Sequence, residues 1–499
     1  MLLHDLMKSI PYIEIINRSG LDPANTDVQS LYLDSRKVLP GGIFVCISGS
    51  LSDGHDYAWA AYNRQCRIFI IEHPINLPDD AFVIVTKNSR VALARLSAAF
   101  FGNPANEMTV IGITGTKGKT TSSLMIYHAL NECGIPTGYI GSNGVTYLDK
   151  TYHTLNTTPE SYDLHFYMRR MLDAGVKTLV MEVSSQALKM ARVHGIRFHT
   201  CVFTNLSPDH IGEHEHPDFN DYKYCKHTLF SEYGAEHIVY NADDEYAEEV
   251  IHGNRCLRTS VALNTPSDIH AGDLSYFRNP GELGVRFLCK TEDETFPVSV
   301  PFPGEFSVYN AMTAIAVCRR LGVAPKRIAE SLKTIRVKGR FETYELPSGA
   351  TAVIDYAHNG VSLKAALQAL RAYEPNRLVC LFGSVGGRTR IRRAELGLVA
   401  SRDADFCILT SDNPDNEAPS AIISEIAAYF TTGTCPYMAI SDRRKAIEYA
   451  LEHAEKNDII LLAGKGHEDY QVVCGVREEF SEAEIIREYC ENAKVSEAL

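Results

Sequence analysis

The sequence has few of the features that place a protein in a membrane, in a disulfide framework or on nucleic acid. No apolar run approaches the roughly 18 residues of a membrane-spanning helix, and the N-terminus lacks the basic segment and clean apolar core of a signal peptide. The 13 cysteines form no CxxC pair, so we expect reduced thiols in a cytoplasmic protein that does not contact membranes. Lys and Arg number 49 against 62 Asp and Glu, a net charge of −13, which argues against nucleic-acid binding.

The remaining composition is that of a globular enzyme with several domains. At about 150 residues per domain, 499 residues suggest three. Strand-like and helix-like segments alternate, which predicts α/β domains with mainly parallel sheets. The pattern restarts after Pro104, where a predicted helix (89–101) has just ended, and again near residue 340. We therefore predict domains at 1–105, 106–337 and 338–499, and expect a monomer.

A glycine-rich segment predicts a phosphate site at the start of the second domain. It follows an apolar strand and opens a helix, the context in which backbone N–H groups cradle phosphate oxygens. Its residues are Gly115, Thr116, Lys117, Gly118, Lys119, Thr120 and Thr121. Lys119 would neutralise the β- and γ-phosphates of ATP or GTP, and the Thr120 hydroxyl would reach Mg²⁺. The loop departs from the strict GxxxxGK[ST] spacing, and an ordinary glycine-rich turn is the alternative.

Nine motifs, in order from about residue 30 to 475, resemble the ATP-dependent Mur ligase family. They are DSRKVLPGGIFVCISGSLSDGHDYAWAA (34–61), GTKGKTT (115–121), NTTPES (156–161), EVSS (182–185), TNLSPDH (204–210), PGEFSVYNAMTAIA (303–316), VKGRFE (337–342), DYAH (355–358) and AGKGHEDYQ (463–471). The first and third are similar to the branch that binds UDP-N-acetylmuramoyl peptides.

The resemblance implies an activity and a fold for each third of the chain. The activity is an ATP-dependent amide ligation: the γ-phosphoryl group passes to the D-glutamate γ-carboxylate of UDP-N-acetylmuramoyl-L-alanyl-D-glutamate. The α-amine of a diamino acid then attacks the acyl phosphate, which serves peptidoglycan precursor synthesis. The implied domains are an N-terminal UDP-binding α/β domain, a central ATPase-like parallel sheet with the phosphate loop, and a C-terminal Rossmann-like α/β domain that selects the amino acid.

The resemblance also implies which residues carry out the reaction, with ATP and Mg²⁺ as cofactors. The metal ion would be bound by Thr120, Glu182, His210 and Lys226. Lys226 aligns with a lysine that the family carbamylates. Arg340 would contact the γ-phosphate. The other nucleotide positions are Asn310, Asp355 and His358, and the UDP-sugar peptide would contact Ser35, Thr157, Thr158, Ser184 and Arg192. The incoming amino acid would contact Arg388, Asp412, Asn413, Asp415, Gly464 and Glu468.

Some of these residues also allow less specific interpretations. Taken singly, Glu182 could be a surface acid at a strand end and Lys226 a solvated helix residue. The cluster of His210, His214, His216, Cys225 and His227 could instead form a zinc site, although the resemblance favours only His210 as a ligand. Gln186 stands where many relatives have His, and DHIGEHEH (209–216) departs from the common DHLDYHG.

One acid bears on which amino acid is added. Relatives that add meso-diaminopimelate carry DNPR, whose arginine binds the distal carboxylate, whereas this sequence has Asp415 at that position. An acid would repel a carboxylate and attract a distal ammonium, so we predict L-lysine, with meso-diaminopimelate, ornithine or another amino acid as alternatives. The same four residues could also simply form an Asx–Pro turn.

Three other functions remain open. A folylpolyglutamate synthetase-like ligase shares the ATP chemistry but not the UDP-side motifs. A P-loop NTPase switch or motor would hydrolyse nucleotide without a UDP-sugar and an amine. A catalytically silent Mur-like binding protein is disfavoured by the presence of Lys119, Glu182, His210, Lys226 and Arg340.

Overall fold

The structure is a computed structural model in which residues 1–499 are described except 50–51, 213–214, 254, 388–389, 432–434 and 498–499. The chain divides into two compact units. Unit 1 comprises 1–269 and 313–323, and unit 2 comprises 270–312 and 324–499. Over the described residues, none of the helices combines the length and the apolar character required to cross a membrane.

Unit 1 begins with a five-stranded sheet in the order β1-β5-β4-β3-β2, in which only β1 runs antiparallel to its neighbour. Alternate residues of its strands pack on α1 and α3 on one face and on α2 on the other, because side chains alternate across a strand. The elements are α1 (Leu3–Met7), β1 (Glu14–Asn17), β2 (Ser30–Tyr32), β3 (Gly42–Val45), α2 (Ala58–Asn63), β4 (Ile68–Ile71), β5 (Phe82–Val85) and α3 (Ser89–Phe100).

Unit 1 also contains eight strands of an eleven-stranded sheet, in the order β13-β12-β11-β6-β10-β7-β8-β9, and the remaining three strands of that sheet are β14 to β16. From β13 to β7 the strands are parallel, so the carboxyl ends of β6, β10 and β11 meet at one edge. Its strands are β6 (Thr109–Thr114), β7 (Thr137–Gly141), β8 (Gly144–Tyr147), β9 (Lys150–Tyr152), β10 (Thr178–Glu182), β11 (Phe198–Phe203), β12 (Ala235–Asn241) and β13 (Leu257–Ala262). Its helices are α4 (Lys119–Glu132), α5 (Ser161–Asp173), α6 (Ser185–Lys189), α7 (Phe219–Ser231) and α8 (Ala247–Ile251).

Unit 2 contains an antiparallel layer and a six-stranded sheet. The antiparallel strands are β14 (Ile269–Asn279), β15 (Glu282–Lys290) and β16 (Thr295–Val300), followed by α9 (Glu305–Arg320), which both units share, and α10 (Pro325–Leu332). The sheet has the order β17-β18-β22-β19-β20-β21, parallel except for β17.

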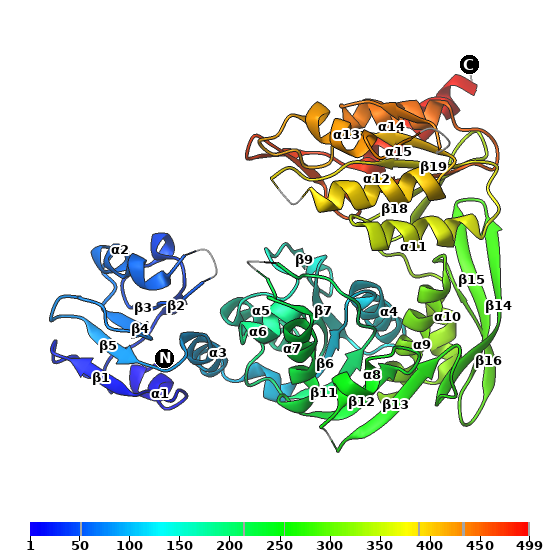
Figure 1. Cartoon of the computed structure of the whole chain (residues 1–499). Helices are drawn as coiled ribbons and strands as arrows, with labels where there is room; N and C mark the ends of the chain where they lie inside the picture. The colour runs from blue at the N-terminus through cyan, green and yellow to red at the C-terminus, as the bar shows by residue number, and fades with distance from the viewer. Residues whose placement is uncertain (50–51, 213–214, 254, 388–389, 432–434, 498–499) are drawn as a thin grey trace. The chain divides into compact units, whose positions relative to one another are not determined.

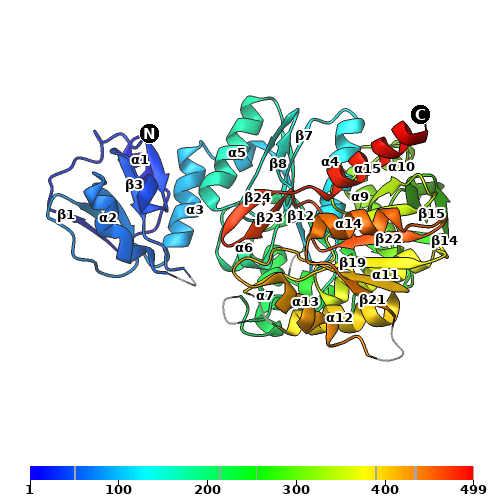
Figure 2. The same cartoon turned by 90° about the horizontal axis from the view of Figure 1, so that it is seen from above.

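The six-stranded sheet is covered on both faces. Helices α14 and α15 pack on the face formed by alternate strand residues such as Ile354, Leu381 and Leu462, and α11 and α12 pack against each other (Figures 1 and 2). The elements are β17 (Glu342–Glu345), β18 (Thr351–Asp355), α11 (Gly360–Arg371), β19 (Leu378–Phe382), α12 (Ile391–Asp403), β20 (Phe406–Leu409), α13 (Pro419–Ala427), β21 (Tyr437–Ala439), α14 (Arg443–Glu452), β22 (Ile459–Ala463), β23 (Tyr470–Val473), β24 (Val476–Glu479) and α15 (Glu482–Glu497).

The predicted α/β fold class is confirmed. Each of the three large sheets consists mainly of parallel strands or has a parallel core. The sequence pattern did not reveal the antiparallel strands β14–β16. Each of the three predicted domains contains one of the three large sheets. The chain nevertheless forms two compact units and not three. The boundaries at 105 and 337 therefore stay predictions.

Candidate functional site

The phosphate loop lies between β6 and α4, at the edge where parallel strands end. Gly115 has φ +147° and Gly118 has φ +84°, and a Cβ on Gly115 would lie 1.9 Å from Thr204 Oγ1, so glycine is required at the first position. The Lys119 ammonium donates to the carbonyl oxygens of Gly115 at 3.0 Å and Thr116 at 3.1 Å. The loop is thus folded around its lysine.

Glu182 ends β10 next to this loop and is fully buried. Its Oε2 accepts a hydrogen bond from Thr120 Oγ1 at 3.0 Å, and its Oε1 accepts from Tyr139 Oη at 2.7 Å and from Ser142 N at 2.9 Å. The interpretation of Glu182 as a surface acid is therefore wrong. A hydroxyl and a carboxylate in contact are the hard oxygen donors that Mg²⁺ prefers.

Lys226 on α7 is 1% exposed, so the interpretation of a solvated helix residue is also wrong. Its Nζ donates to the Gly115 carbonyl at 2.8 Å and lies 4.4 Å from the centroid of the Tyr222 ring. Burial, and then the charge of Lys119, hold the pKa of Lys226 well below its ordinary value. Among the described residues Lys226 has no ion pair with a carboxylate.

Among the described members of the possible zinc site, the side chains of His210, His216 and His227 each have different partners. His210 is half-exposed with φ +55°, and its Nδ1 lies 3.4 Å from Glu215. His216 is fully buried, and its two ring nitrogens contact Asp221 and Ser185. His227 bonds to the Val250 carbonyl, while His214 lies outside the described residues.

A cavity of about 470 Å³ in unit 1 brings several predicted residues together. It is lined by six of them: Lys119, Thr157, Ser184, Arg192, His210 and Lys226. Thr158 lies behind this wall, where its hydroxyl donates to the Glu182 carbonyl at 2.9 Å. Ser35 is buried at the start of a short 3-10 helix and is not part of the lining. Phosphate-loop and UDP-side positions therefore share one cavity.

Arg90 was not singled out from the sequence, because nothing in the pattern of α3 distinguishes it from other helix arginines. It lines the same cavity and lies 3.9 Å from Glu160, whose other oxygen is 2.8 Å from Arg192. Arg192 also donates to the Thr158 carbonyl at 3.1 Å. Two guanidinium groups around one carboxylate leave this part of the cavity positively charged, which suits an anionic substrate.

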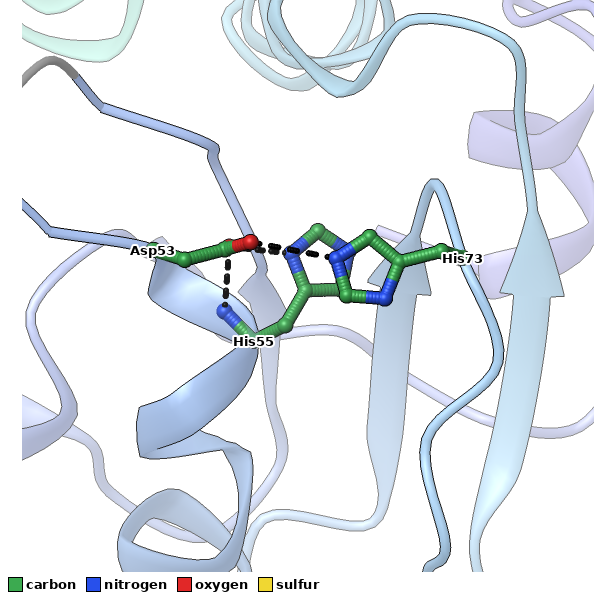
Figure 3. Close-up of side chains that lie close together, drawn as sticks. All are labelled: Asp53, His55 and His73. Atoms are coloured by element: carbon green, nitrogen blue, oxygen red, sulfur yellow. Dashed lines mark hydrogen bonds and ion pairs between the residues drawn. The ribbon is translucent and has the colours of Figure 1, made fainter.

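Near the cavity's Gly49 and Ser52, a second cluster has metal-ligand composition (Figure 3). Asp53 accepts from His55 Nδ1 at 2.5 Å and lies 3.1 Å from His73 Nε2. The Nε2 of His55, however, accepts from the Glu72 N–H at 2.9 Å. The ring proton of a neutral His55 must then be on Nδ1, which leaves no ring lone pair for a metal ion. This network instead stabilises the turn that Asp53 caps.

Unit 2 holds the predicted nucleotide positions Arg340, Asp355, His358 and Asn310. Asp355 ends β18, and its Oδ2 accepts from Phe341 N at 3.0 Å. Burial raises the pKa of Asp355 to about 6, with Arg340 opposing the shift. The Arg340 guanidinium stacks 4.9 Å from the Tyr356 ring, and His358 contacts the Tyr356 carbonyl at 2.8 Å. Asn310 is buried on α9.

Lys465, which sequence reasoning missed, is the centre of the predicted amino-acid site. It is fully buried, and its Nζ lies 3.0 Å from Asn413 Oδ1, 3.2 Å from Glu468 and 3.6 Å from Asp412. The amide of Asn413 donates to Glu468 at 2.9 Å. Gly464 has φ +113°, and a Cβ there would approach Asp412 Oδ2 to 3.0 Å. The signal available in the sequence was a lysine, Lys465, in the same short motif as the acid Glu468.

Asp415 is built into the contact between its loop and the β23–β24 hairpin. Its Oδ1 accepts from Gly475 N at 3.0 Å, and its backbone pairs with Val472 at 2.9 Å and Cys474 at 2.7 Å. The φ of +51° marks a tight turn. A turn follows Pro414, whose carbonyl accepts from Glu417 N at 3.0 Å, but Asn413 Oδ1 accepts from Lys465 and Val472 and not from Asp415 N, so it is not the predicted Asx–Pro turn. Asp415 is partly exposed. Arg388 lies outside the described residues.

These features define an α/β protein with a phosphate-binding loop, of the class that uses a nucleoside triphosphate. Comparison with known proteins narrows the class. The Mur ligase middle domain family matches residues 113–318, and the Mur ligase glutamate ligase domain family matches 339–466.

Two relatives are named UDP-N-acetylmuramoyl-L-alanyl-D-glutamate–2,6-diaminopimelate ligase. The protein from Caldanaerobacter subterraneus subsp. tengcongensis is 37% identical over 93% of this chain and 95% of its own, and that from Geobacillus thermodenitrificans is 36% identical over 95% and 96%. A solved structure with the same name has a TM-score of 0.68 at 26% identity and covers 95% of this chain and 97% of its own. The chain belongs to the Mur ligase family of ATP-dependent peptide ligases.

Proposed function

We propose that the protein adds a diamino acid to the D-glutamate of UDP-N-acetylmuramoyl-L-alanyl-D-glutamate, driven by ATP through an acyl phosphate. The observation that carries the proposal is the cavity in unit 1. Its wall combines the phosphate-loop Lys119 and buried Lys226 with Thr157, Ser184 and Arg192, the predicted UDP-sugar contacts. Names of relatives at 36–37% identity agree with this reaction.

The difficulty in this reaction is to bring an anionic carboxylate close to a triphosphate. Lys119 and the backbone of Gly115–Thr121 would bind the phosphates, and Arg192 with Arg90 would attract the anionic peptide substrate. Screening of charge that develops during phosphoryl transfer is the largest contribution that such groups make.

Thr120 and Glu182 fit Mg²⁺, since their oxygens lie 3.0 Å apart at the phosphate loop. His210, on the cavity wall, would complete the site with Lys226. A cationic lysine cannot bind a metal, but the low pKa of Lys226 favours the neutral amine, which can take up carbon dioxide and release a proton to form a carbamate. Mg²⁺ would supply charge neutralisation for the triphosphate.

In unit 2 we propose separate sets of residues for the nucleotide and the amino acid. Asn310, Arg340, Asp355 and His358 would bind the nucleotide, and Arg340 would contact its γ-phosphate. Asp412, Asn413, Gly464 and Glu468, with Asp415 and Arg388, would bind the amino acid. The boundaries 1–105, 106–337 and 338–499 then assign UDP binding, ATP chemistry and amino-acid selection to successive domains.

For the amino acid itself we propose L-lysine, because Asp415 places a negative charge where a second carboxylate of the substrate would be repelled. meso-Diaminopimelate is the second candidate, favoured by the names of the relatives. The role of Asp415 in holding Gly475 is compatible with both, since only its Oδ1 is engaged in that hydrogen bond.

The test is an ADP-release assay with UDP-N-acetylmuramoyl-L-alanyl-D-glutamate and a panel of amino acids. We expect ADP release to require both the nucleotide-sugar and the amine, with L-lysine preferred. Release without either substrate would indicate an NTPase, and release with a folate substrate a folylpolyglutamate synthetase-like enzyme. A clear preference for meso-diaminopimelate would refute the argument from Asp415 while leaving the ligase intact.

A further inference from the structure

Three side chains form a hydrogen-bonded chain that ends on the wall of the cavity in unit 1. Asp221 Oδ2 lies 2.6 Å from His216 Nδ1, and His216 Nε2 lies 2.9 Å from Ser185 Oγ. Ser185 lines the cavity beside Ser184, whereas His216 is fully buried behind it. The residues come from α6, α7 and the loop before α7, so the chain is a tertiary arrangement.

The direction of each hydrogen bond follows from the chemistry of the end group. A carboxylate only accepts, so the ring proton of a neutral His216 lies on Nδ1 and Nε2 carries the lone pair. His216 is fully buried, and a neutral ring satisfies both contacts, with Asp221 accepting from Nδ1 and Ser185 donating to Nε2. Lys189, at 2.8 Å from Asp221 Oδ2, keeps that group a carboxylate.

These hydrogen-bond directions determine what the Ser185 hydroxyl can bind. Its hydroxyl proton is donated to His216 Nε2, and the oxygen lone pairs remain for groups in the cavity. We propose that Ser185 is a substrate contact that accepts a hydrogen bond, and that His216 and Asp221 are positioning residues that set its polarity. The proposal rests on the proposed function, which places UDP-N-acetylmuramoyl-L-alanyl-D-glutamate in this cavity. The amide N–H groups of that peptide are donors of the required kind.

A metal ion is a weaker interpretation of the same region. Ligand atoms of His216, Asp221 and Cys225 lie within 4.8 Å of one another. Both ring nitrogens of His216 already have hydrogen-bond partners, and burial raises the pKa of the Cys225 thiol to about 11, so the thiol stays protonated. The hydrogen-bonded chain uses His216 without such conflicts.

The experiment measures KM for the nucleotide-sugar peptide at saturating ATP and amino acid, together with its Kd by calorimetry. For Ser185→Ala we expect both constants to rise about threefold to tenfold, the effect of one neutral hydrogen bond, with kcat within about twofold and KM for ATP unchanged. His216→Ala should give the same rise. In the double variant the second substitution should add nothing, because His216 acts only through Ser185.

Two further variants separate this role from a structural one. His216→Gln keeps an acceptor for Ser185 and should restore part of the affinity. His227→Gln, on α7 with Asp221 and outside the cavity lining, is the matched control and should leave KM and Kd unchanged. If His216→Ala does not fold, Ser185→Ala and His216→Gln still carry the test.

The possible failures are distinguishable. Unchanged KM and Kd in Ser185→Ala, or additive effects in the double variant, would overturn the role of the chain. Loss of kcat at constant KM would overturn it in favour of a chemical role for Ser185. If the unaltered protein binds the nucleotide-sugar but forms no product, the proposed reaction is wrong and the calorimetric comparison still tests Ser185. If it does not bind at all, both proposals fall.

Discussion

Over the residues whose burial is described, two lysines are buried, and their surroundings are opposite. Lys226 in unit 1 is 1% exposed and contacts a carbonyl oxygen and an aromatic ring. Lys465 in unit 2 is fully buried and lies within 3.6 Å of Asp412 and Glu468. The same side chain is thus buried once without a carboxylate in contact and once between two of them.

The difference indicates different uses. An uncompensated buried ammonium is costly, so the side chain becomes neutral and chemically reactive. A compensated one remains a cation and fixes the geometry of its partners. We infer that Lys226 serves chemistry and Lys465 serves positioning, and the following substitutions test that contrast.

The largest effect is expected for Lys226→Ala. If a carbamate on Lys226 helps to hold the metal, ligation should fall about 1000-fold, as for loss of a group that stabilises developing charge. Short carboxylic acids added to the assay should restore part of the activity by occupying the vacated space. The measurement is ADP release at saturating substrates.

Lys223→Ala is the matched control, because Lys223 lies on the same helix and pairs with an exposed acid, Glu249. It should leave the rate within about twofold, because its partner Glu249 is exposed and an ion pair open to water contributes little. Lys226→Ala with undiminished ligation would refute a catalytic role for this lysine and remove one side of the comparison.

Lys465→Met should act on stability as well as on binding. The apolar side chain of similar length leaves Asp412 and Glu468 as buried acids without their cation, which costs about 3 kcal/mol. We expect a lower free energy of unfolding in urea and a higher KM for the amino acid. KM for the nucleotide-sugar should not change. Lys456→Met, at an exposed position, is the control; equal effects of the two variants would contradict the positioning role.

Asp355 extends the contrast to an acid whose burial is only partly compensated. Its pKa of about 6 in the folded protein lies above the ordinary 3.8, so the folded state binds the proton more tightly. The stabilisation is complete below about pH 4 and is lost as the pH rises through 6. A shift of this size corresponds to about 3 kcal/mol.

Urea unfolding between pH 4 and pH 7.5 measures this effect. The free energy of unfolding of the unaltered protein should fall relative to Asp355→Asn across this range. Asp79→Asn, at an exposed residue, should follow the unaltered protein at every pH. Parallel curves for the unaltered protein and Asp355→Asn would show that the pKa of Asp355 is not raised.

Much of this architecture could be predicted from sequence because local patterns determine it. The strand, glycine turn and helix around Gly115–Thr121 are contiguous, and apolar runs mark the parallel strands. Strands β14–β16 were missed because their half-exposed, alternating residues resemble polar loop sequence. Sequence motifs also brought Glu182 and Lys226 to attention before any contact was known.

Other features depend on tertiary contacts that spacing cannot reveal. Ser185 and His216 are 31 residues apart, and only folding brings their polar atoms to 2.9 Å. Lys465 stands in a predicted motif together with Glu468, but its other two partners, Asp412 and Asn413, come from a segment that lies 52 residues earlier at Asn413. The burial of Lys226 likewise reversed the default expectation for a helix lysine.

The smallest effect concerns the edge of the Lys465 cluster, where Asp415 is proposed to select the amino acid. Asp415→Arg should move the preference from L-lysine toward meso-diaminopimelate by about tenfold in the ratio of kcat/KM, because the sign of the charge facing the distal carboxylate is reversed. The variant also loses the acceptor for Gly475 N, so stability has to be compared separately.

Asp415→Asn keeps that acceptor and removes only the charge, and should weaken the preference for lysine without reversing it. If Asn and Arg variants lose activity equally with both amino acids, Asp415 supports the hairpin and selection resides elsewhere among the partners of Lys465.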